Sequence, residues 1–244
     1  MKFSKISVCS CAVVLAFGLT ISHAEEKPGK WESSLALGLT LNDGNTDNSM
    51  FNASYLLGYT TEAGNPLRLN ADLAYGETDN DKTTDNYKVE LDYKHLISER
   101  AYGSLNASYF SDDISDLDYR WIVSPGVGYF LMKQENVTLT AEIGPALIGE
   151  KKGGETEENV ALRIAERYER KMDSSARFWQ ALEYIPNIDD FEVYILNAEI
   201  GVEAPVSEKL NIRLVVKNTY DSDPAPDRKN NDVTVIGALA YSIF

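Results

Sequence analysis

Apolar and polar residues alternate along most of this chain. From Trp31 to Asn42, the odd positions read Trp, Ser, Leu, Leu, Leu, Leu and the even positions read Glu, Ser, Ala, Gly, Thr, Asn. The segments Leu67–Gly76 and Tyr87–Lys94 show the same period of two. Because successive side chains of a β-strand point to opposite faces, this pattern predicts strands with one apolar face.

Twelve such segments follow one another and define the predicted fold. Their ranges are 31–42, 49–60, 67–77, 86–96, 101–110, 117–130, 137–148, 159–170, 176–186, 191–204, 210–220 and 232–244. These lengths suit strands that cross a bilayer at a tilt, which takes roughly 9–11 residues. The prediction is an all-β fold, a closed antiparallel transmembrane β-barrel, because an unpaired strand edge in hydrocarbon leaves backbone groups without partners.

Strands eight to ten carry the weakest pattern. Glu166 and Gln180 interrupt the apolar face, and the phase of the alternation drifts between Phe191 and Tyr194. If two of these segments were one irregular strand, the barrel would have ten strands. Twelve strands is the main prediction, and ten is the alternative.

The connections between these segments alternate in length. Those after odd-numbered strands are polar and mostly long, as in Thr78–Asp85 and Gly149–Glu158. Those after even-numbered strands are tight, as in Ile97–Arg100 and Lys171–Ser175. This alternation predicts outer loops at one end of the barrel and short periplasmic turns at the other. No connection is expected to fold into the barrel interior.

Aromatic residues gather near both ends of the predicted lipid face. Those near periplasmic strand ends are Trp31, Tyr59, Tyr93, Tyr129, Tyr168 and Tyr241, and those near outer ends are Phe51, Tyr75, Tyr87, Tyr109, Tyr119, Tyr184, Tyr194 and Tyr220. Two such belts are typical of outer-membrane barrels, because these rings are apolar in body and polar at one edge. The alternative is a soluble β-sandwich or lipocalin-like barrel with the rings in its core.

Residues 1–24 are expected to form a cleaved signal peptide. Lys2 and Lys5 precede a short apolar stretch, and Ser22-His23-Ala24 places small residues where a signal peptidase reads them. The apolar stretch is shorter than the roughly 20 residues of a spanning helix. The chain therefore reads as an exported protein and not as a helical membrane protein.

The remaining residues, 25–244, are predicted to form one barrel domain, which is acidic. The whole chain carries a formal charge of −15, and loss of Lys2 and Lys5 with the signal peptide makes it −17. So acidic a chain is not expected to bind nucleic acid. Both cysteines, Cys9 and Cys11, precede residue 25, so the barrel has no thiol for a disulfide or a metal site.

A series of short motifs runs through the predicted barrel. In order they are Trp31-Glu32, Leu35–Thr40, Gly44–Asp47, Asp118–Arg120, Gly126–Tyr129, Gly144-Pro145, Tyr220–Pro224 and Tyr241–Phe244. With these motifs, residues 31–244 resemble the bacterial family known as domain of unknown function 481, the salt-induced outer-membrane proteins. The resemblance implies an outer-membrane barrel linked to salt or osmotic response, and it supplies no catalytic residues.

The end of the chain departs from the pattern of such barrels. They commonly end in an aromatic residue, one intervening residue and Phe, whereas this chain ends in Tyr241-x-x-Phe244. A terminal Phe is retained, but the spacing of the signal for the barrel-assembly machinery differs by one residue.

Few residues could support catalysis. Outer-membrane hydrolases generally need a histidine base beside a nucleophile or an activated water. His95 is the single histidine after the signal peptide, and the phase counted from Tyr87 places it on the lipid face near the periplasmic end of its strand. We interpret His95 as a residue of the membrane interface and expect neither an enzyme nor a cofactor.

Acidic residues gather in the predicted outer loops. A candidate rim consists of Asp112, Asp113, Asp116, Asp221 and Asp223. Such a rim could concentrate cations, or bind Ca²⁺ or Mg²⁺ through oxygen ligands. No loop has the Asp-x-Asp-x-Asp-Gly spacing of a calcium-binding loop, so solvated loops are the simpler interpretation.

Charges of both signs occupy the face predicted to line the barrel interior. They are Arg68, Asp72, Lys88, Glu90, Asp92, Lys94, Arg120, Glu142, Arg163, Arg213 and Lys217. Because an unpaired buried charge is costly, facing charges in a narrow barrel tend to pair and fill it. A packed interior and a small water-filled pore with opposed rows of charge both fit this pattern.

Three functions fit these observations. The first is a non-enzymatic envelope barrel, either a narrow, cation-preferring pore or a structural protein, used under salt stress. The second is a binding barrel whose acidic rim engages divalent cations or lipopolysaccharide. The third and most remote is an outer-membrane hydrolase. The expected partners are outer-membrane lipids, lipopolysaccharide and the barrel-assembly machinery.

Overall fold

The computed structural model describes residues 29–42, 48–172 and 175–243 of this chain, so the predicted signal peptide lies outside the described residues. Within them the chain forms twelve strands, which confirms the main prediction and shows that the ten-strand alternative is wrong. The strands are β1 (Lys30–Asn42), β2 (Asn48–Thr60), β3 (Pro66–Thr78), β4 (Asp81–Leu96), β5 (Ala101–Asp112), β6 (Leu117–Lys133), β7 (Val137–Lys152), β8 (Glu155–Lys171), β9 (Arg177–Pro186), β10 (Tyr194–Pro205), β11 (Leu210–Asp221) and β12 (Asn231–Ser242).

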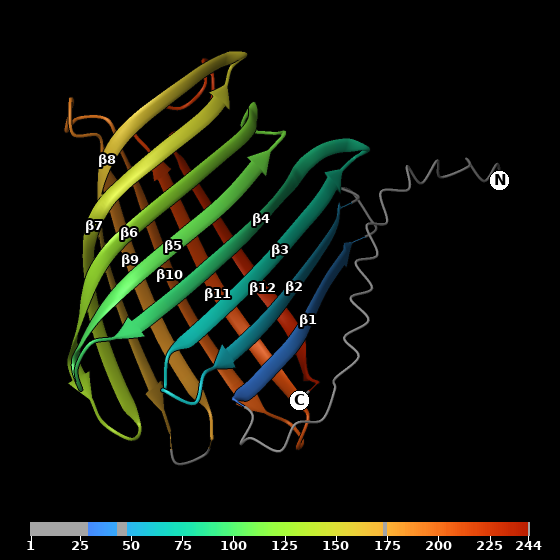
Figure 1. The fold of residues 1–244 in the computed structure, drawn as a ribbon. Helices are drawn as coiled ribbons and strands as arrows, with labels where there is room; N and C mark the ends of the chain where they lie inside the picture. The colour runs from blue at the N-terminus through green and yellow to red at the C-terminus, as the bar shows by residue number, and fades with distance from the viewer. Residues whose placement is uncertain (1–28, 43–47, 173–174, 244) are drawn as a thin grey trace, which may run out of the picture.

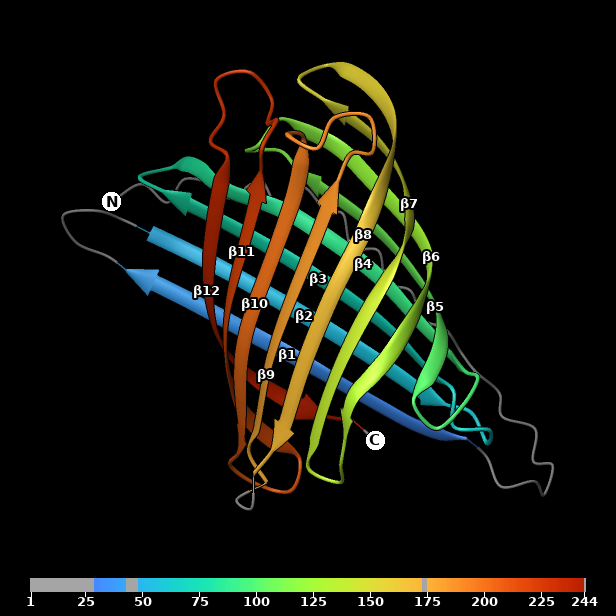
Figure 2. The same cartoon turned by 90° about the vertical axis from the view of Figure 1, so that its left-hand side faces the viewer.

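The strands form a closed antiparallel barrel. Each strand pairs with the next along the chain, and β1 closes the ring by pairing with β12. Figures 1 and 2 show that the strands tilt against the barrel axis, β1–β4 more steeply than β9–β11. Closure requires such a tilt. β1 begins and β12 ends at the same end of the barrel, which we call the periplasmic end, and the opposite end is the outer end.

Two of the predicted long loops are tight turns at the tips of long hairpins. β3 and β4 are joined by Asp79 and Asn80, with φ angles of 51° and 71°, and β7 and β8 by Gly153 and Gly154, with 58° and 83°. Two-residue turns with positive φ match the twist of paired strands. The sequence pattern missed these strand ends because they extend beyond the membrane, where water solvates both faces and the alternation is lost.

The irregular part of the pattern has a structural explanation. Gln180 donates a hydrogen bond to Glu166 at 3.1 Å on the outward face, so the two polar residues that interrupt this face satisfy one another. Phe191 lies in the loop before β10, which begins at Tyr194, and this accounts for the drift in phase. β12 ends at Ser242, whereas the prediction carried it to Phe244, which lies outside the described residues.

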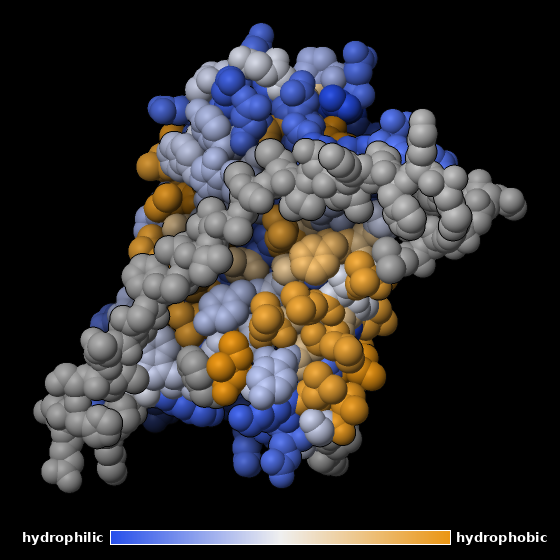
Figure 3. Space-filling model, turned by 90° about the vertical axis from the view of Figure 1, so that its right-hand side faces the viewer, coloured by the Kyte–Doolittle hydropathy of each residue, from blue (hydrophilic) through white to orange (hydrophobic). Residues whose placement is uncertain are grey.

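The apolar faces of the strands point outward. Large hydrophobic side chains are exposed around the barrel, for example Leu39 at 67%, Val235 at 60% and Leu147 at 52%. Figure 3 shows hydrophobic residues over the middle of the wall, with hydrophilic residues above and below them. A soluble barrel would place these side chains inside, so the soluble alternatives are wrong. No helix in the described part of the chain is long and apolar enough to cross a membrane.

Aromatic rings border this apolar surface at both ends. Near the outer end, Tyr109 lies between Tyr87 and Tyr119, with ring centroids 5.9 and 6.5 Å away. Near the periplasmic end, the rings of Trp31 and Tyr59 are 4.5 Å apart. A second outer row joins Tyr184, Tyr194 and Tyr220. The exterior is therefore that of a transmembrane barrel with two aromatic belts.

Close packing inside the wall depends on glycine at a few positions. The indole of Trp179 lies against Gly201 of the neighbouring strand, and a Cβ added to Gly201 would overlap with the indole ring. Gly103, in contrast, has no atom within 4 Å of such a Cβ. The two glycines form a matched pair for testing this packing.

We expect Gly201→Val to lower the free energy of unfolding of the barrel by about 1–3 kcal/mol, because the added side chain displaces the indole. Urea unfolding in lipid vesicles, followed by tryptophan fluorescence, measures the change. Gly103→Val is the control, since its side chain enters open space. Equal losses in the two variants would contradict the packing of Trp179 on Gly201.

Candidate functional site

The interior of the barrel holds a cavity of about 620 Å³ whose wall includes residues from all twelve strands. It reaches Pro66 and Arg177 at the periplasmic end and Asp112 and Asp232 at the outer end. A water molecule occupies about 30 Å³ of liquid, so the cavity has room for many waters along the length of the barrel. This favours a water-filled interior over a packed one.

All eleven charged residues predicted for the interior lie on the wall of this cavity. They are Arg68, Asp72, Lys88, Glu90, Asp92, Lys94, Arg120, Glu142, Arg163, Arg213 and Lys217. Each follows from the strand period, because a residue one position away from an outward apolar side chain must point inward. Acidic and basic side chains are present in similar numbers on this wall.

Arg163 of β8 is the centre of an ion-pair network on the wall. Its Nε donates to Glu183 at 2.5 Å, and Nη1 donates to Glu142 at 3.0 Å. Lys94 lies 2.8 Å from the same Glu142, and the Tyr102 hydroxyl donates to it at 2.9 Å. Arg163 is only 8% exposed, so its charge is stabilised by these carboxylates and not by bulk water.

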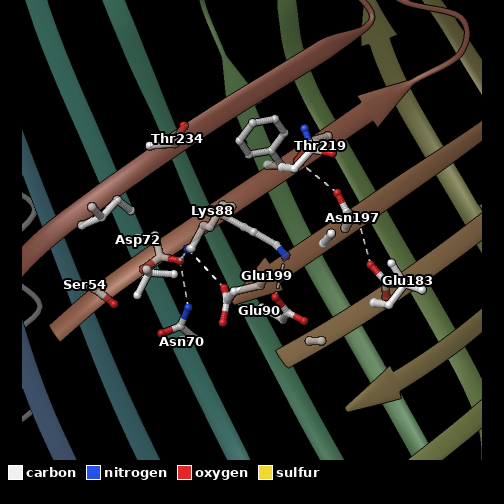
Figure 4. A pocket seen from close by; sticks show the side chains of 18 of the residues that line it. Ser54, Asn70, Asp72, Lys88, Glu90, Glu183, Asn197, Glu199, Thr219 and Thr234 are labelled. Atoms are coloured by element: carbon white, nitrogen blue, oxygen red, sulfur yellow. Dashed lines mark hydrogen bonds and ion pairs between the residues drawn. The ribbon is translucent and has the colours of Figure 1, made fainter. Parts of the chain in front are cut away.

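The network continues along the wall toward the last strands. Asn197 donates to Glu183 at 2.9 Å and accepts a hydrogen bond from the Thr219 hydroxyl at 3.0 Å. Facing these groups, Lys88 and Glu90 form an ion pair of 2.6 Å on β4. Figure 4 shows these side chains projecting into the cavity from β4 on one side and from β9, β10 and β11 on the other.

Three ion pairs cross the interior between strands that are four or five positions apart in the barrel. From the outer to the periplasmic end they are Arg120 with Asp221 at 2.6 Å, Lys217 with Asp72 at 2.8 Å, and Arg68 with Glu169 at 3.4 Å. Such pairs place charge in the middle of the lumen, so they narrow the water path at three levels.

The outermost of these pairs belongs to a cluster of five charges. Arg120 also binds Glu150, and Lys152 lies 3.3 Å from Glu150 and 3.1 Å from Asp223. The side chains of Arg120 and Glu150 are 8% and 7% exposed. Two cations therefore hold three carboxylates together at the outer mouth of the cavity.

The loop between β11 and β12 covers part of this mouth. Residues 222–230 lean toward the β7–β8 turn, where Pro226 lies against Gly153, and Ala225 is only 2% exposed. Ala225 and Arg228 of this loop line the cavity. The contribution of a loop to the lining of the outer mouth was not predicted from the sequence. The loop is polar and of ordinary length, and its sequence carries no signal for this contact.

The predicted acidic rim is dispersed among separate partners. Asp112 accepts hydrogen bonds from the backbone N–H groups of Ile114 and Ser115, and Asp113 lies 2.9 Å from Lys82. Asp116 occupies a turn position with φ of 54°. Asp221 points into the barrel toward Arg120, and Asp223 pairs with Lys152.

These contacts bear on the divalent-cation hypothesis. In the described part of the chain, no group of three or more Asp, Glu, His or Cys side chains could hold a metal ion. A divalent cation needs several oxygen ligands, and here the rim carboxylates are bound by lysine, arginine and backbone groups instead. Cation binding at the rim stays a prediction.

Other interior residues were not among the predicted site residues. Glu169 and Glu203 pair with arginines near the periplasmic end, as in the 2.6 Å contact of Glu203 with Arg213. Tyr102 is 1% exposed beside Lys94. The phase of their strands would have identified all three residues as inward-facing. For Tyr102, however, an aromatic ring at an inward position would have been interpreted as core packing.

His95 lies where the pattern predicted it. It is the second-last residue of β4, its side chain is exposed, and its Nδ1 is 3.5 Å from Asn65 Nδ2 at the adjacent turn. Its exposed side chain therefore lies on the face of β4 opposite to the charged interior.

The comparison with family models identifies the family of this chain. The family described as "Protein of unknown function, DUF481" matches residues 35–243. The chain belongs to this family. With its closed barrel, apolar exterior and charged interior, this member of the family is a transmembrane β-barrel of the bacterial outer membrane. No curated protein matches the chain.

Several solved outer-membrane barrels are similar in structure to this family member. The NanC porin shares 7% identity at a TM-score of 0.49, over 86% of this chain and 96% of that one. The KdgM porin in complex with disordered oligogalacturonate shares 8% identity at a TM-score of 0.48, and the match covers 88% of this chain and 100% of that one. The translocator domain of the autotransporter NalP from Neisseria meningitidis shares 12% identity at a TM-score of 0.43, and the match covers 87% of this chain and 86% of that one.

Proposed function

We propose that the barrel is a non-enzymatic, narrow, water-filled pore for ions and small polar solutes. The observation that carries this proposal is the cavity of about 620 Å³, which extends between the two ends of the barrel and is lined by charges of both signs. Eight-stranded barrels have interiors that side chains fill, whereas barrels of 16 strands leave a wide channel. Twelve strands with long charged side chains inside give an intermediate, constricted lumen.

The pore is proposed to prefer cations weakly. The interior wall is close to balanced in charge, because most carboxylates there pair with lysine or arginine. The excess negative charge of the chain therefore acts mainly at the outer mouth, where it raises the local concentration of cations. Such a preference falls as salt increases, because the Debye length shortens from about 10 Å at 0.1 M to about 3 Å at 1 M.

Single-channel recording of the refolded barrel in planar bilayers tests this function. We expect steady conductance steps. In a KCl gradient, the reversal potential should indicate a preference for K⁺ at low salt and little selectivity at high salt. A barrel whose mobility on unheated gels shows that it is folded, but which does not conduct ions, would contradict the proposed pore function. A structural function in the envelope would then remain.

We also propose that residues 1–24 direct export and that the barrel-assembly machinery inserts the chain. Lipopolysaccharide is the proposed outer neighbour, because the long hairpins of β3–β4 and β7–β8 rise beyond the apolar band. Use under salt stress is a further proposal, which comparison of growth with and without the gene at high salt would test.

A further inference from the structure

Four arginines gather on the cavity wall at the periplasmic end of the barrel. They are Arg68 near the start of β3, Arg167 near the end of β8, Arg177 at the start of β9 and Arg213 near the start of β11. β3 and β9 lie six positions apart in the ring of strands, so Arg68 and Arg177 come from opposite walls. We call these four residues the arginine cluster.

The arginine cluster converges around Glu169 of β8. Glu169 Oε1 accepts a hydrogen bond from Arg167 Nε at 2.7 Å and, across the lumen, one from Arg68 Nη1 at 3.4 Å. Glu169 pairs with Trp179 in the β8–β9 ladder, so Arg177, two residues before Trp179, is its diagonal neighbour. Diagonal neighbours lie roughly 7–8 Å apart, within the reach of long side chains. The guanidinium groups of Arg68 and Arg177 therefore approach the same part of the lumen.

Two carboxylates pair with the arginine cluster in the described chain. Glu169 is the first of them. Glu203 is the second, and it lies 2.6 Å from both Nε and Nη2 of Arg213 and 3.8 Å from Arg177 Nη2. Four guanidinium groups thus share two carboxylates, which leaves an excess of positive charge at this end of the lumen.

Other carboxylates on the adjoining wall have donors of their own. Asp92, which is opposite Arg68 in the β3–β4 ladder, accepts a hydrogen bond from Asn106 at 2.7 Å. Glu199 accepts one from the indole of Trp179 at 2.5 Å. These two carboxylates reduce the excess of positive charge, but they do not occupy the N–H groups of the arginine cluster.

Arg68 and Arg177 have the most accessible N–H groups of the cluster. Their side chains are 44% and 37% exposed, whereas that of Arg213 is 11% exposed. Arg68 makes one long hydrogen bond, and the 3.8 Å from Arg177 to Glu203 exceeds hydrogen-bond distance. The Arg177 guanidinium lies 5.1 Å from the centre of the Trp179 ring, a contact that orients the planar group without using its donors.

We propose that the arginine cluster binds a small periplasmic solute that carries two or more phosphate or carboxylate groups. Arg68 and Arg177 contact its oxygen atoms from opposite walls, because the guanidinium fork matches the geometry of both groups. Arg167 and Arg213 stay paired with their glutamates and add to the positive potential that attracts the anion. Such a site adds a class of solute to the proposed pore, and binding to it does not require the barrel to conduct.

Calorimetric titration of the refolded full barrel with inorganic pyrophosphate, in a neutral detergent and 0.1 M KCl, tests the site. We expect pyrophosphate to bind to the unmodified barrel. Arg68→Gln and Arg177→Gln should each weaken this binding about tenfold, because each removes a charged fork that faces the anion. Arg177→Lys keeps the charge without the fork and should weaken binding only about threefold.

Lys88→Gln is the matched control. It removes a positive charge from the same cavity wall, but from a lysine that is paired with Glu90 at 2.6 Å. Lys88 lies four residues along β4 from Asp92, which is roughly 13 Å and exceeds the Debye length of about 10 Å. Binding of pyrophosphate should therefore change about twofold or less.

Three outcomes of the titration would overturn the proposal. They are a folded, unmodified barrel that does not bind pyrophosphate, equal affinity in both Arg→Gln variants and the unmodified barrel, and a loss in Lys88→Gln as large as in Arg177→Gln. Mobility on unheated gels shows whether each variant is folded.

Single-channel recording separates this site from the pore function. Pyrophosphate in both chambers should lower the K⁺ current of the unmodified barrel, and Arg177→Gln should require about tenfold more pyrophosphate for the same block. Binding by a barrel that does not conduct would support the site and contradict the pore. Steady conductance without any binding of pyrophosphate would support the pore and overturn the site.

Discussion

Arg120→Met is expected to lower the free energy of unfolding of the barrel by about 3–5 kcal/mol, because it removes one partner of a buried ion-pair cluster. The side chains of Arg120 and Glu150 are 8% and 7% exposed, and Asp221 is bound from the opposite wall at 2.6 Å. Methionine fills a similar volume but leaves two carboxylates without this cation. Urea unfolding in lipid vesicles, followed by tryptophan fluorescence, measures the loss.

Lys151→Met provides the control for this experiment. Lys151 lies in β7 and forms a 2.6 Å ion pair with Asp118, but both side chains are largely exposed, at 40% and 56%. Water and salt screen such a pair, so its removal should change the free energy of unfolding little. If Arg120→Met were as mild as Lys151→Met, the outer cluster would not hold the barrel together.

The fold of the barrel could be predicted from the sequence because a membrane imposes one rule on every strand. Nearly every lipid-facing position is apolar, apart from the hydrogen-bonded Glu166 and Gln180, so the period of two marks the segments inside the bilayer, as between Tyr87 and Lys94. The rule ceases at the membrane boundary. Charged residues such as Lys152 and Glu155 were assigned to a loop for this reason, although they end and begin paired strands.

The site could be predicted only in part. The strand phase identifies which residues face the interior, and all eleven predicted charges do so. The phase does not reveal which charges meet, because Arg68 and Glu169 are 101 residues apart and belong to strands on opposite walls. The loop at the outer mouth has no sequence signal, since its position depends on the stagger and closure of the whole barrel.

Lys217→Gln and Asp72→Asn are expected to shift ion selectivity in opposite directions while both raise the conductance. Lys217 and Asp72 form a 2.8 Å ion pair across the lumen, between β11 and β3. Loss of either charge breaks the pair and widens the water path, for which we expect a conductance about twofold higher. Lys217→Gln removes a positive charge and leaves Asp72 and the neighbouring Glu199 to attract K⁺, whereas Asp72→Asn removes a negative charge and shifts the selectivity toward Cl⁻, by less because Glu199 still faces Lys217.

Single-channel currents and reversal potentials in KCl gradients separate the two effects. The difference in selectivity should be large at 0.1 M salt and small at 1 M, because the Debye length falls from about 10 Å to about 3 Å. The increase in conductance should persist at both concentrations, since it reflects the width of the path. The Lys217→Gln/Asp72→Asn double variant is the control, and it should conduct well with the selectivity of the unmodified barrel. A shift in the same direction for both single variants would show that ions do not pass this pair, and the path through the charged side of the lumen would be wrong.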